Sequence, residues 1–470
     1  MTVLTPDVQL SKTEFKDQPI LAWSLIVLSS ILLGIWAVKG TIALRNVLLG
    51  VETLLSFFYC LNFFRFNKEK IPFRNWLPLI LLGLMFCWVI FHYLFLSRFP
   101  EQQFHELTST WFRSGLAVVV GIGTGLAFQK RPNAINLLWI GILLSFAYLF
   151  YQYTPKALAL KSLFAPDYVN YIFYGKISGV LAGTILVLGL LGTMADAIRR
   201  GQFWNIFGTA ILWLLGTATA LYAYVFIFDA RNGVGLAAIF FTLMIITTIF
   251  QLIKAALARK MGLSAPLLLA LIIVSTVMLG WFGIQHIKHN PGWSTMWEDT
   301  KTSIQIQKYP NWQNPQVMGY PQNPNGEVVK ANTYERLAWA SAGARIFLPE
   351  NPLGVGILSK PFTILLMQKY PNGGAYIPST HSAWVEIALA FGYPGLLLTL
   401  GALFGLSCIS VSFAGPHQYL TSLLSLGLVL LYTVGEISSQ HAIEMLCFLI
   451  ALMSALLPSS EQGKPMKSEY

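Results

Sequence analysis

Charged side chains are scarce in this sequence. Asp, Glu, Lys and Arg make up 11% of its 470 residues, and 55% of the residues are hydrophobic. A soluble domain has roughly a quarter of its residues charged. The composition therefore excludes an ordinary soluble enzyme and predicts a membrane protein with many spans.

Cysteine and several catalytic motifs are also scarce or missing. The four cysteines all lie inside apolar runs, which argues against a disulfide framework or a cysteine metal cluster. The sequence has no phosphate-binding P-loop, no His-Glu-x-x-His, no Asp-x-Asp and no Gly-x-Ser-x-Gly. We therefore expect neither a metal site nor a cofactor.

Basic residues exceed acidic ones, which gives a net charge of +11. In a membrane protein such an excess is typical of cytoplasmic loops and of contacts with anionic lipids. Membrane lipids are therefore expected partners, and nucleic acid is not.

Apolar runs of about 18 to 25 residues are typical of membrane-spanning helices, and on this basis we predict an all-α protein with about twelve spans. The predicted spans are residues 20–38, 42–64, 76–96, 114–128, 134–153, 177–198, 204–228, 233–253, 265–284, 383 or 394 to about 413, 419–435 and 443–457. The tenth has two starting points because Gly392-Tyr-Pro-Gly395 is expected to break a helix.

The positions of the basic clusters predict the orientation. If the N-terminus is cytoplasmic, every positive cluster next to a span also lies on the cytoplasmic side, and so does the C-terminus. Residues 1–284 then carry spans one to nine, residues 285–380 form a periplasmic cap, and residues 381–470 carry the last three spans and a cytoplasmic tail. The cap segment has ten of the 23 prolines and four tryptophans, too many aromatic residues for a disordered linker.

Three arginines lie near the predicted outer ends of spans. Arg45 is in the second span, Arg113 opens the fourth, and Arg231 lies in the turn before the eighth. Each one alone is explained by contact with headgroups, or for Arg231 by a pair with Asp229. Three together, on the side that orientation rules deplete of arginine, favour a shared anion site.

The cap adds two further arginines. Arg336 and Arg345 lie on residues 335–348, which have the spacing of an amphipathic helix that stops at Pro349. The alternative for both arginines is a solvated helix face. The glycines of the following Pro352-Leu-Gly-Val-Gly356 turn would let backbone N–H groups approach an anion.

His381 lies where the cap returns to the membrane. A lone histidine at such a boundary is either an interfacial side chain or a base. Glu386 is five residues further on, so it would orient the ring only if the chain is irregular there; otherwise it is a polar packing residue.

Three segments follow one another in the second half of the chain. They are Asp229-Ala-Arg-Asn-Gly233; Arg336-Leu-Ala-Trp339 leading to Asn351-Pro-Leu-Gly-Val-Gly356; and His381-Ser-Ala-Trp-Val-Glu386 leading to Gly392-Tyr-Pro-Gly395. As an ordered set over about residues 229–400, they resemble the bacterial O-antigen ligase and polymerase family.

This resemblance implies about twelve helices and an outward-facing site between membrane and cap, where glycan is moved from undecaprenyl pyrophosphate. The functional positions that it implies are Arg231, Arg336 and His381. The spacing of Arg345 and Gly356 also resembles a pattern associated with the polymerases, so the choice within the family stays open.

The residue types suit such chemistry. A pyrophosphate needs permanent cations that form two parallel hydrogen bonds, which favours arginine, and a sugar hydroxyl needs a base that is neutral near pH 7, which favours histidine. The pyrophosphate ester itself supplies the driving force, so ATP is not needed. We predict that His381 is catalytic and that the pyrophosphate-binding residues are Arg231, Arg336, Arg113, Arg45 and Arg345.

The predicted function is an inverting, metal-independent O-antigen ligase of the bacterial inner membrane. It would move O-antigen polysaccharide from undecaprenyl pyrophosphate to lipid A-core at a site facing the periplasm. The alternatives are an O-antigen polymerase, a protein O-oligosaccharyltransferase and, from another class, a transporter or flippase for the lipid-linked glycan. A transporter is expected to carry charges at the membrane midplane in paired halves, whereas these charges lie at the outer boundary.

Overall fold

The computed structural model describes residues 18–66, 72–164, 171–201, 203–257, 264–371, 379–412, 415–437 and 441–457. These ranges are largely helical and contain no β-strand, which confirms the predicted all-α class.

Nine helical segments in these ranges are long and apolar enough to cross a membrane. They consist of α2 (Ile42–Phe66), α3 (Phe73–Phe95), α4 (Pro100–Glu106) with η1 (Leu107–Trp111) and α5 (Phe112–Lys130), η2 (Pro132–Ile135) with α6 (Asn136–Leu160), α7 (Lys176–Arg200), α8 (Phe203–Tyr222) with η4 (Ala223–Ile227), α9 (Arg231–Leu257), α10 (Ser264–His289) and α16 (Ala383–Val411). The other three predicted spans coincide with shorter apolar helices, α1 (Pro19–Ile35), α17 (Gln418–Val434) and α18 (Ala442–Leu456). The chain is thus a multi-pass membrane protein, and the count of twelve spans stays a prediction.

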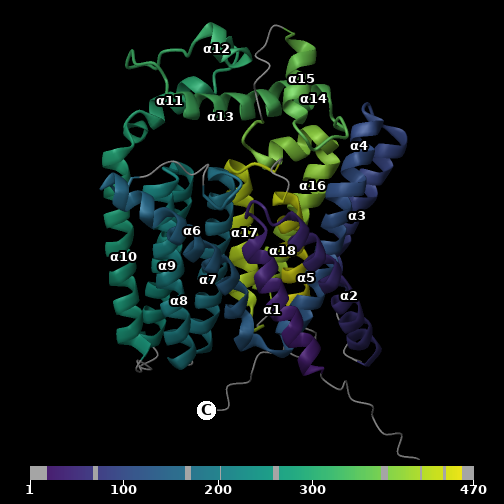
Figure 1. Cartoon of the computed structure of the whole chain (residues 1–470), viewed down its shortest axis with the longest axis vertical. Coiled ribbons are helices and arrows are strands. Elements are labelled where there is room, and N and C mark those ends of the chain that lie inside the picture. Colours follow the sequence, from purple (N-terminus) through teal and green to yellow (C-terminus); the bar gives the residue numbers. More distant parts are fainter. Residues whose placement is uncertain are drawn as a thin grey trace, which may run out of the picture.

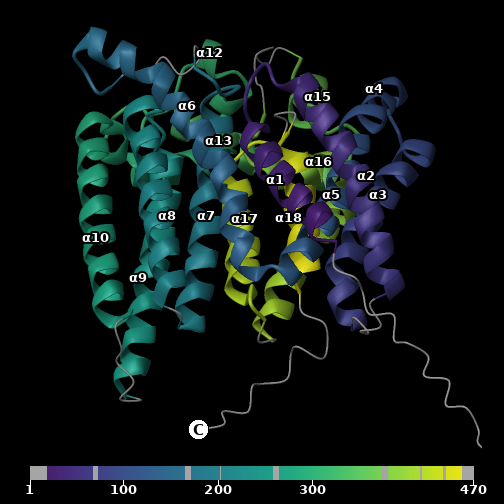
Figure 2. The same cartoon turned by 60° about the horizontal axis from the view of Figure 1, so that its bottom comes forward.

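Exposed apolar side chains along α10 show why the bundle needs lipid around it. Ile273, Val277, Trp281 and Ile284 are each about half exposed, and their spacing puts them on one face of the helix. Figures 1 and 2 both place α10 at one edge of the bundle and α3 at the other. Lipid tails would cover such a face.

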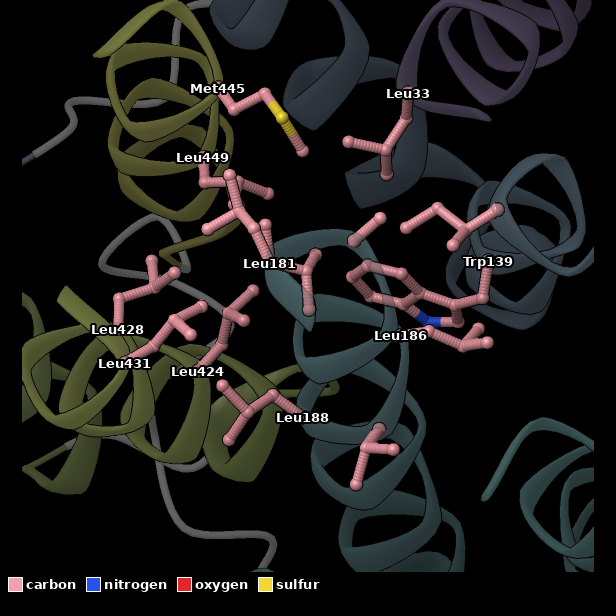
Figure 3. Close-up of a cluster of buried hydrophobic side chains, with 14 of the residues drawn as sticks. Leu33, Trp139, Leu181, Leu186, Leu188, Leu424, Leu428, Leu431, Met445 and Leu449 are labelled. Carbon is pink, nitrogen blue, oxygen red and sulfur yellow. The ribbon is translucent and has the colours of Figure 1, made fainter. Parts of the chain in front are cut away.

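Helix α7 lies at the centre of the bundle. Every residue from Ser178 to Ile198 is buried, and Figure 3 shows its leucines between Trp139 of α6 and the leucines of α17. Glycine makes this packing feasible, because a Cβ at Gly189 would lie 2.4 Å from the Trp139 ring. The middle of the bundle around α7 is therefore closely packed.

The fourth span differs from its prediction. It begins at Pro100, not at residue 114. The prediction missed the first part of the span because Gln103 and Glu106 interrupt the apolar pattern, although both side chains are buried. The Glu106 carboxylate accepts hydrogen bonds from the backbone N–H groups of Leu358 (2.8 Å) and Ser359 (2.7 Å). A distant loop thus satisfies a carboxylate that hydropathy alone places outside the span.

The segment between α10 and α16 forms a cap at one end of the bundle (Figure 1). Its elements are η5 (Pro291–Trp293), α11 (Met296–Ser303), η6 (Pro310–Gln313), α12 (Pro315–Met318), α13 (Ala331–Ala342), η7 (Gly343–Phe347), α14 (Leu348–Glu350) and α15 (Pro361–Lys369). The amphipathic helix predicted for residues 335–348 is present as the continuous run α13–η7–α14, which extends further at both ends. A separate apolar cluster, including Trp312, Trp339 and Phe362, holds the cap together.

Helix α16 is interrupted where the sequence predicted a break. Phe391 (φ −127°, ψ 15°) and Gly392 (φ 68°, ψ −169°) leave the helical conformation. The carbonyls of Leu389 and Ala390 instead accept hydrogen bonds from the backbone N–H groups of Val355 (3.0 Å) and Gly356 (2.7 Å). The cap loop after α14 is therefore bonded into the break.

Candidate functional site

His381 lies in a tight turn between the cap and α16. Its φ of 57° is in the left-handed region, which is uncommon for a residue with a side chain. The Glu386 carboxylate accepts a hydrogen bond from the Thr380 N–H (2.5 Å), and the Ala383 N–H donates to the Gly435 carbonyl (2.8 Å). Such held strain is typical of functional sites.

The His381 ring is enclosed by residues from two other elements. It stacks on Trp339 of α13, with ring centroids 5.7 Å apart and an angle of 21° between the planes. Its Nδ1 contacts the carboxylate of Glu436, which follows α17. The ring therefore has Glu436 as its carboxylate partner, whereas Glu386 holds the backbone of the turn.

Three cationic side chains lie close enough together near this turn to repel one another. They are Lys176 at the start of α7, Arg231 at the start of α9 and Arg336 of α13, all half-buried. Burial lowers the pKa of Arg336, the nearby carboxylate of Glu436 opposes this shift, and Arg231 adds to it. Arg336 thus has both an anion and a second guanidinium as electrostatic neighbours.

Arg231 joins the bundle to the cap. Its Nη1 donates to the Gly292 carbonyl (2.7 Å), and its Nη2 donates to the Thr333 hydroxyl (3.1 Å). Arg336 uses its Nε to donate to the Asn332 side chain (2.7 Å). A guanidinium has five N–H groups, so both arginines keep further donors beyond these described contacts.

A pair with Asp229 was the alternative explanation for Arg231. In the structure, the Asp229 carboxylate contacts two other residues. Its Oδ1 accepts from the Asn290 amide (2.9 Å) and contacts Nε2 of His286 (3.1 Å). Because the Trp293 N–H donates to the other nitrogen of His286 (3.0 Å), Nε2 carries the proton and donates to Asp229. This hydrogen bond lowers the pKa of Asp229 well below its usual value.

Arg45 and Arg113 meet in a second cluster, around Glu444 of α18. The Arg113 Nε is 2.6 Å from one oxygen of Glu444, and the Trp36 N–H donates to the other oxygen (3.0 Å). Arg45 is only 3% exposed and donates to the Trp36 carbonyl (2.7 Å). Its guanidinium also lies 5.9 Å from the ring centroid of Tyr174, two residues before the lysine that opens α7.

Arg345 lies apart from both clusters. It is exposed, and its Nη1 donates to the Ile304 carbonyl within the cap (2.9 Å). The N–H groups of Val355 and Gly356 are bonded into the break of α16, so the expectation that these two groups approach an anion is wrong. Within the ranges that the structure describes, no cluster of three His, Cys, Asp or Glu side chains is suited to a metal ion.

Sequence reasoning named three of the residues at the His381 turn and missed two. Arg231, Arg336 and His381 were expected, whereas Lys176 and Glu436 were not. Lys176 carried a usable signal, because it is a basic residue at the predicted outer end of a span.

A comparison of the sequence with models of protein families relates the chain to known proteins. Residues 217–400 match the model of a family described as O-antigen ligase. The match runs from α8 through the cap to the middle of α16 and includes Arg231, Arg336 and His381. The chain shows no match to a curated protein. The match confirms the resemblance to this family that the sequence predicted for about residues 229–400.

Proposed function

We propose that the protein transfers O-antigen polysaccharide from undecaprenyl pyrophosphate to lipid A-core. The family match supports a ligase- or polymerase-type function. The observation that carries the finer proposal is the gathering of Lys176, Arg231 and Arg336 beside the turn of His381.

The three cations bind the pyrophosphate of the donor. They lie at the starts of α7 and α9 and on the cap, where a lipid headgroup meets the protein while its chain stays between the spans. Guanidinium groups bind phosphate oxygens through paired N–H donors, and partial burial strengthens such bonds. A bound dianion would also offset the mutual repulsion of the three side chains.

His381 acts as the general base. It removes the proton from an acceptor hydroxyl, whose oxygen then bonds to the anomeric carbon of the donor sugar. The bond from that carbon to the pyrophosphate oxygen breaks with inversion, and the cations hold the undecaprenyl pyrophosphate that leaves. Arg45 and Arg113 add positive charge behind this site, since Arg45 is buried and its guanidinium lies 5.9 Å from the ring centroid of Tyr174, two residues before Lys176.

The proposed location is the bacterial inner membrane, with the cap in the periplasm and both termini in the cytoplasm. Basic residues at the helix ends remote from the cap support this orientation (Figure 1). They are Arg65, Lys130, Arg131, Arg199 and Arg200.

The Arg345 and Gly356 pattern is weak support for a polymerase. Arg345 bonds within the cap, whereas a Cβ at Gly356 would lie 2.4 Å from the Gln103 side chain. The two residues thus have separate surroundings, and the glycine serves close packing.

In the experiment that tests the proposal, purified protein in lipid nanodiscs receives undecaprenyl pyrophosphate-linked glycan as the donor. The acceptor is either lipid A-core or more of the lipid-linked glycan. Glycan joined to lipid A-core supports the ligase. Elongated lipid-linked glycan, in the absence of that product, identifies a polymerase. Transport of intact donor across a vesicle membrane without either product would support the flippase and overturn the proposal.

A further inference from the structure

We propose that Asp229 is a positioning residue of the pyrophosphate site: it holds the turn before α9 so that Arg231 and Lys176 are kept close to each other. This inference rests on the proposed function, in which these two cations bind the donor pyrophosphate. A carboxylate repels a pyrophosphate, so the presence of Asp229 beside these cations needs an explanation other than direct contact with the donor.

The turn that carries Asp229 is short and strained. It joins Ile227, the last residue of η4, to Arg231, the first residue of α9. Asp229 has φ 44°, in the left-handed region that few residues with a side chain adopt, although Asp is one of those that do. Since such a conformation persists only where its surroundings hold it, the contacts of Asp229 help to determine where α9 and its Arg231 begin.

A chain of hydrogen bonds joins the Asp229 carboxylate to the Arg231 guanidinium. Oδ1 of Asp229 accepts from the Asn290 amide (2.9 Å), and the Asn290 side-chain oxygen accepts from the Gly292 N–H (3.1 Å). The Gly292 carbonyl in turn accepts from Nη1 of Arg231 (2.7 Å). His286, which is fully buried, contacts the same oxygen of Asp229 (3.1 Å). The carboxylate therefore fixes the guanidinium through the loop that follows α10.

Asp229 also holds Lys176. Its main-chain carbonyl accepts a hydrogen bond from Nζ of Lys176, and its carboxylate attracts the same ammonium. A lysine side chain is a flexible four-carbon stem, so a fixed acceptor is needed to place its charge. Arg336, the third cation, is held separately by Asn332. One residue thus places two of the three cations, and its loss should weaken pyrophosphate binding while Arg336 keeps its own support.

The test compares two substitutions of Asp229. Asp229→Asn keeps an oxygen that can accept from Asn290 and His286, and Asn tolerates left-handed backbone. Asp229→Gly removes the side chain without adding backbone strain at this φ. If Asp229 acts by positioning, the glycine variant should lose affinity for a pyrophosphate and the asparagine variant should keep it. If Asp229 acted only through its charge, both variants would bind an anion more tightly than wild type.

Binding is measured without turnover, by calorimetric titration of the full-length protein in nanodiscs with farnesyl pyrophosphate, a soluble isoprenoid pyrophosphate. We expect the Kd to rise about 10- to 100-fold in Asp229→Gly and to stay within about threefold in Asp229→Asn, because misplaced binding groups cost up to about 100-fold. Asn290→Ala breaks the same chain one step further on and should also raise the Kd, so the test stands if Asp229→Gly does not fold. The control is Asn311→Ala, which removes two side-chain bonds within the cap (3.1 Å each to the carbonyls of Met318 and Gly319) and should leave the Kd unchanged.

Comparison with Arg231→Ala separates this inference from the proposed function. A Kd that Arg231→Ala does not raise would overturn the pyrophosphate site, and this inference with it. A Kd that rises in Arg231→Ala but not in Asp229→Gly, or that changes alike in Asp229→Gly and Asp229→Asn, would overturn this inference alone. In the Arg231→Ala background, Asp229→Gly should raise the Kd by less than it does in wild type, because one of the two side chains through which it acts is gone. Full additivity of the two effects would also overturn the inference.

Discussion

Replacing Gly392 with alanine tests how the cap is joined to the bundle. Gly392 has φ 68° and ψ −169°, a conformation that is essentially restricted to glycine. An added Cβ would lie 2.2 Å from the Pro352 carbonyl oxygen and 2.5 Å from the Leu353 carbonyl carbon. Both atoms belong to backbone, so a side-chain rotation cannot relieve the clash.

The cost has two parts. Forcing alanine into this conformation costs about 1–3 kcal/mol. The loop around Pro352 must also move, which endangers the hydrogen bond from the Tyr393 N–H to the Pro352 carbonyl (2.9 Å) and those that Val355 and Gly356 donate to α16. At about 1 kcal/mol for each of these three bonds, the total loss is roughly 4–6 kcal/mol.

Thermal unfolding of detergent-purified protein, followed by tryptophan fluorescence, measures the effect. We expect the apparent Tm of Gly392→Ala to fall by about 5 °C or more. The matched control is Gly405→Ala on the same helix, where the nearest atom to a new Cβ is 3.9 Å away. Helix propensity favours that change by about 1 kcal/mol. Equal apparent Tm values for the two variants would refute the reasoning.

Three further predictions concern the site and the orientation. Arg336→Lys should reduce turnover nearly as much as Arg336→Ala, by about 100-fold, because one ammonium does not replace the paired N–H donors of the guanidinium. Arg345→Lys is the control and should stay within about twofold of wild type. Equal rates for the two lysine variants in the transfer assay would contradict pyrophosphate binding by Arg336. His381→Ala should lower turnover by about 10²- to 10⁴-fold and preserve carrier binding in a pull-down with lipid-linked donor, and a loss of binding in step with rate would make the ring a phosphate ligand. A membrane-impermeant thiol label added to spheroplasts should modify a cysteine at Glu327 in the cap and spare one at Ser412, both exposed positions; the reverse pattern would invert the topology.

Hydropathy predicted most of the bundle because a spanning helix is a local feature of the sequence. It fails at the fourth span, where Gln103 and Glu106 look like loop residues. Their burial depends on a loop about 250 positions away, whose N–H groups meet the Glu106 carboxylate. A window along the chain contains no information about such a partner.

The site divides in the same way. Arg231, Arg336 and His381 belong to ordered local motifs, and the sequence therefore identifies them. Glu436 belongs to none of these motifs, because it reaches His381 only through the fold, where the Ala383 N–H bonds to the Gly435 carbonyl. Its one sequence signal is rarity: it is a carboxylate at the end of an apolar run in a chain with only 20 acidic residues.

The segments that carry the family resemblance contain charged residues and glycines, and these have different roles in the structure. Arg231 and Arg336 are electrostatic neighbours of each other, and His381 contacts the carboxylate of Glu436, which also attracts Arg336. The glycine-rich segments 351–356 and 392–395 instead bond to each other at the break in α16. Gly354 (φ 86°) and Gly392 (φ 68°) allow this approach, since a Cβ at Gly354 would lie 2.4 Å from the Ala390 carbonyl oxygen. These glycines fix where the cap loop meets the break inside α16. The turn that carries His381 lies at the other end of the helical stretch before that break, directly ahead of Ala383. The glycine motifs of this chain therefore serve first to join the cap loop to α16. They affect the position of His381 only through that packing.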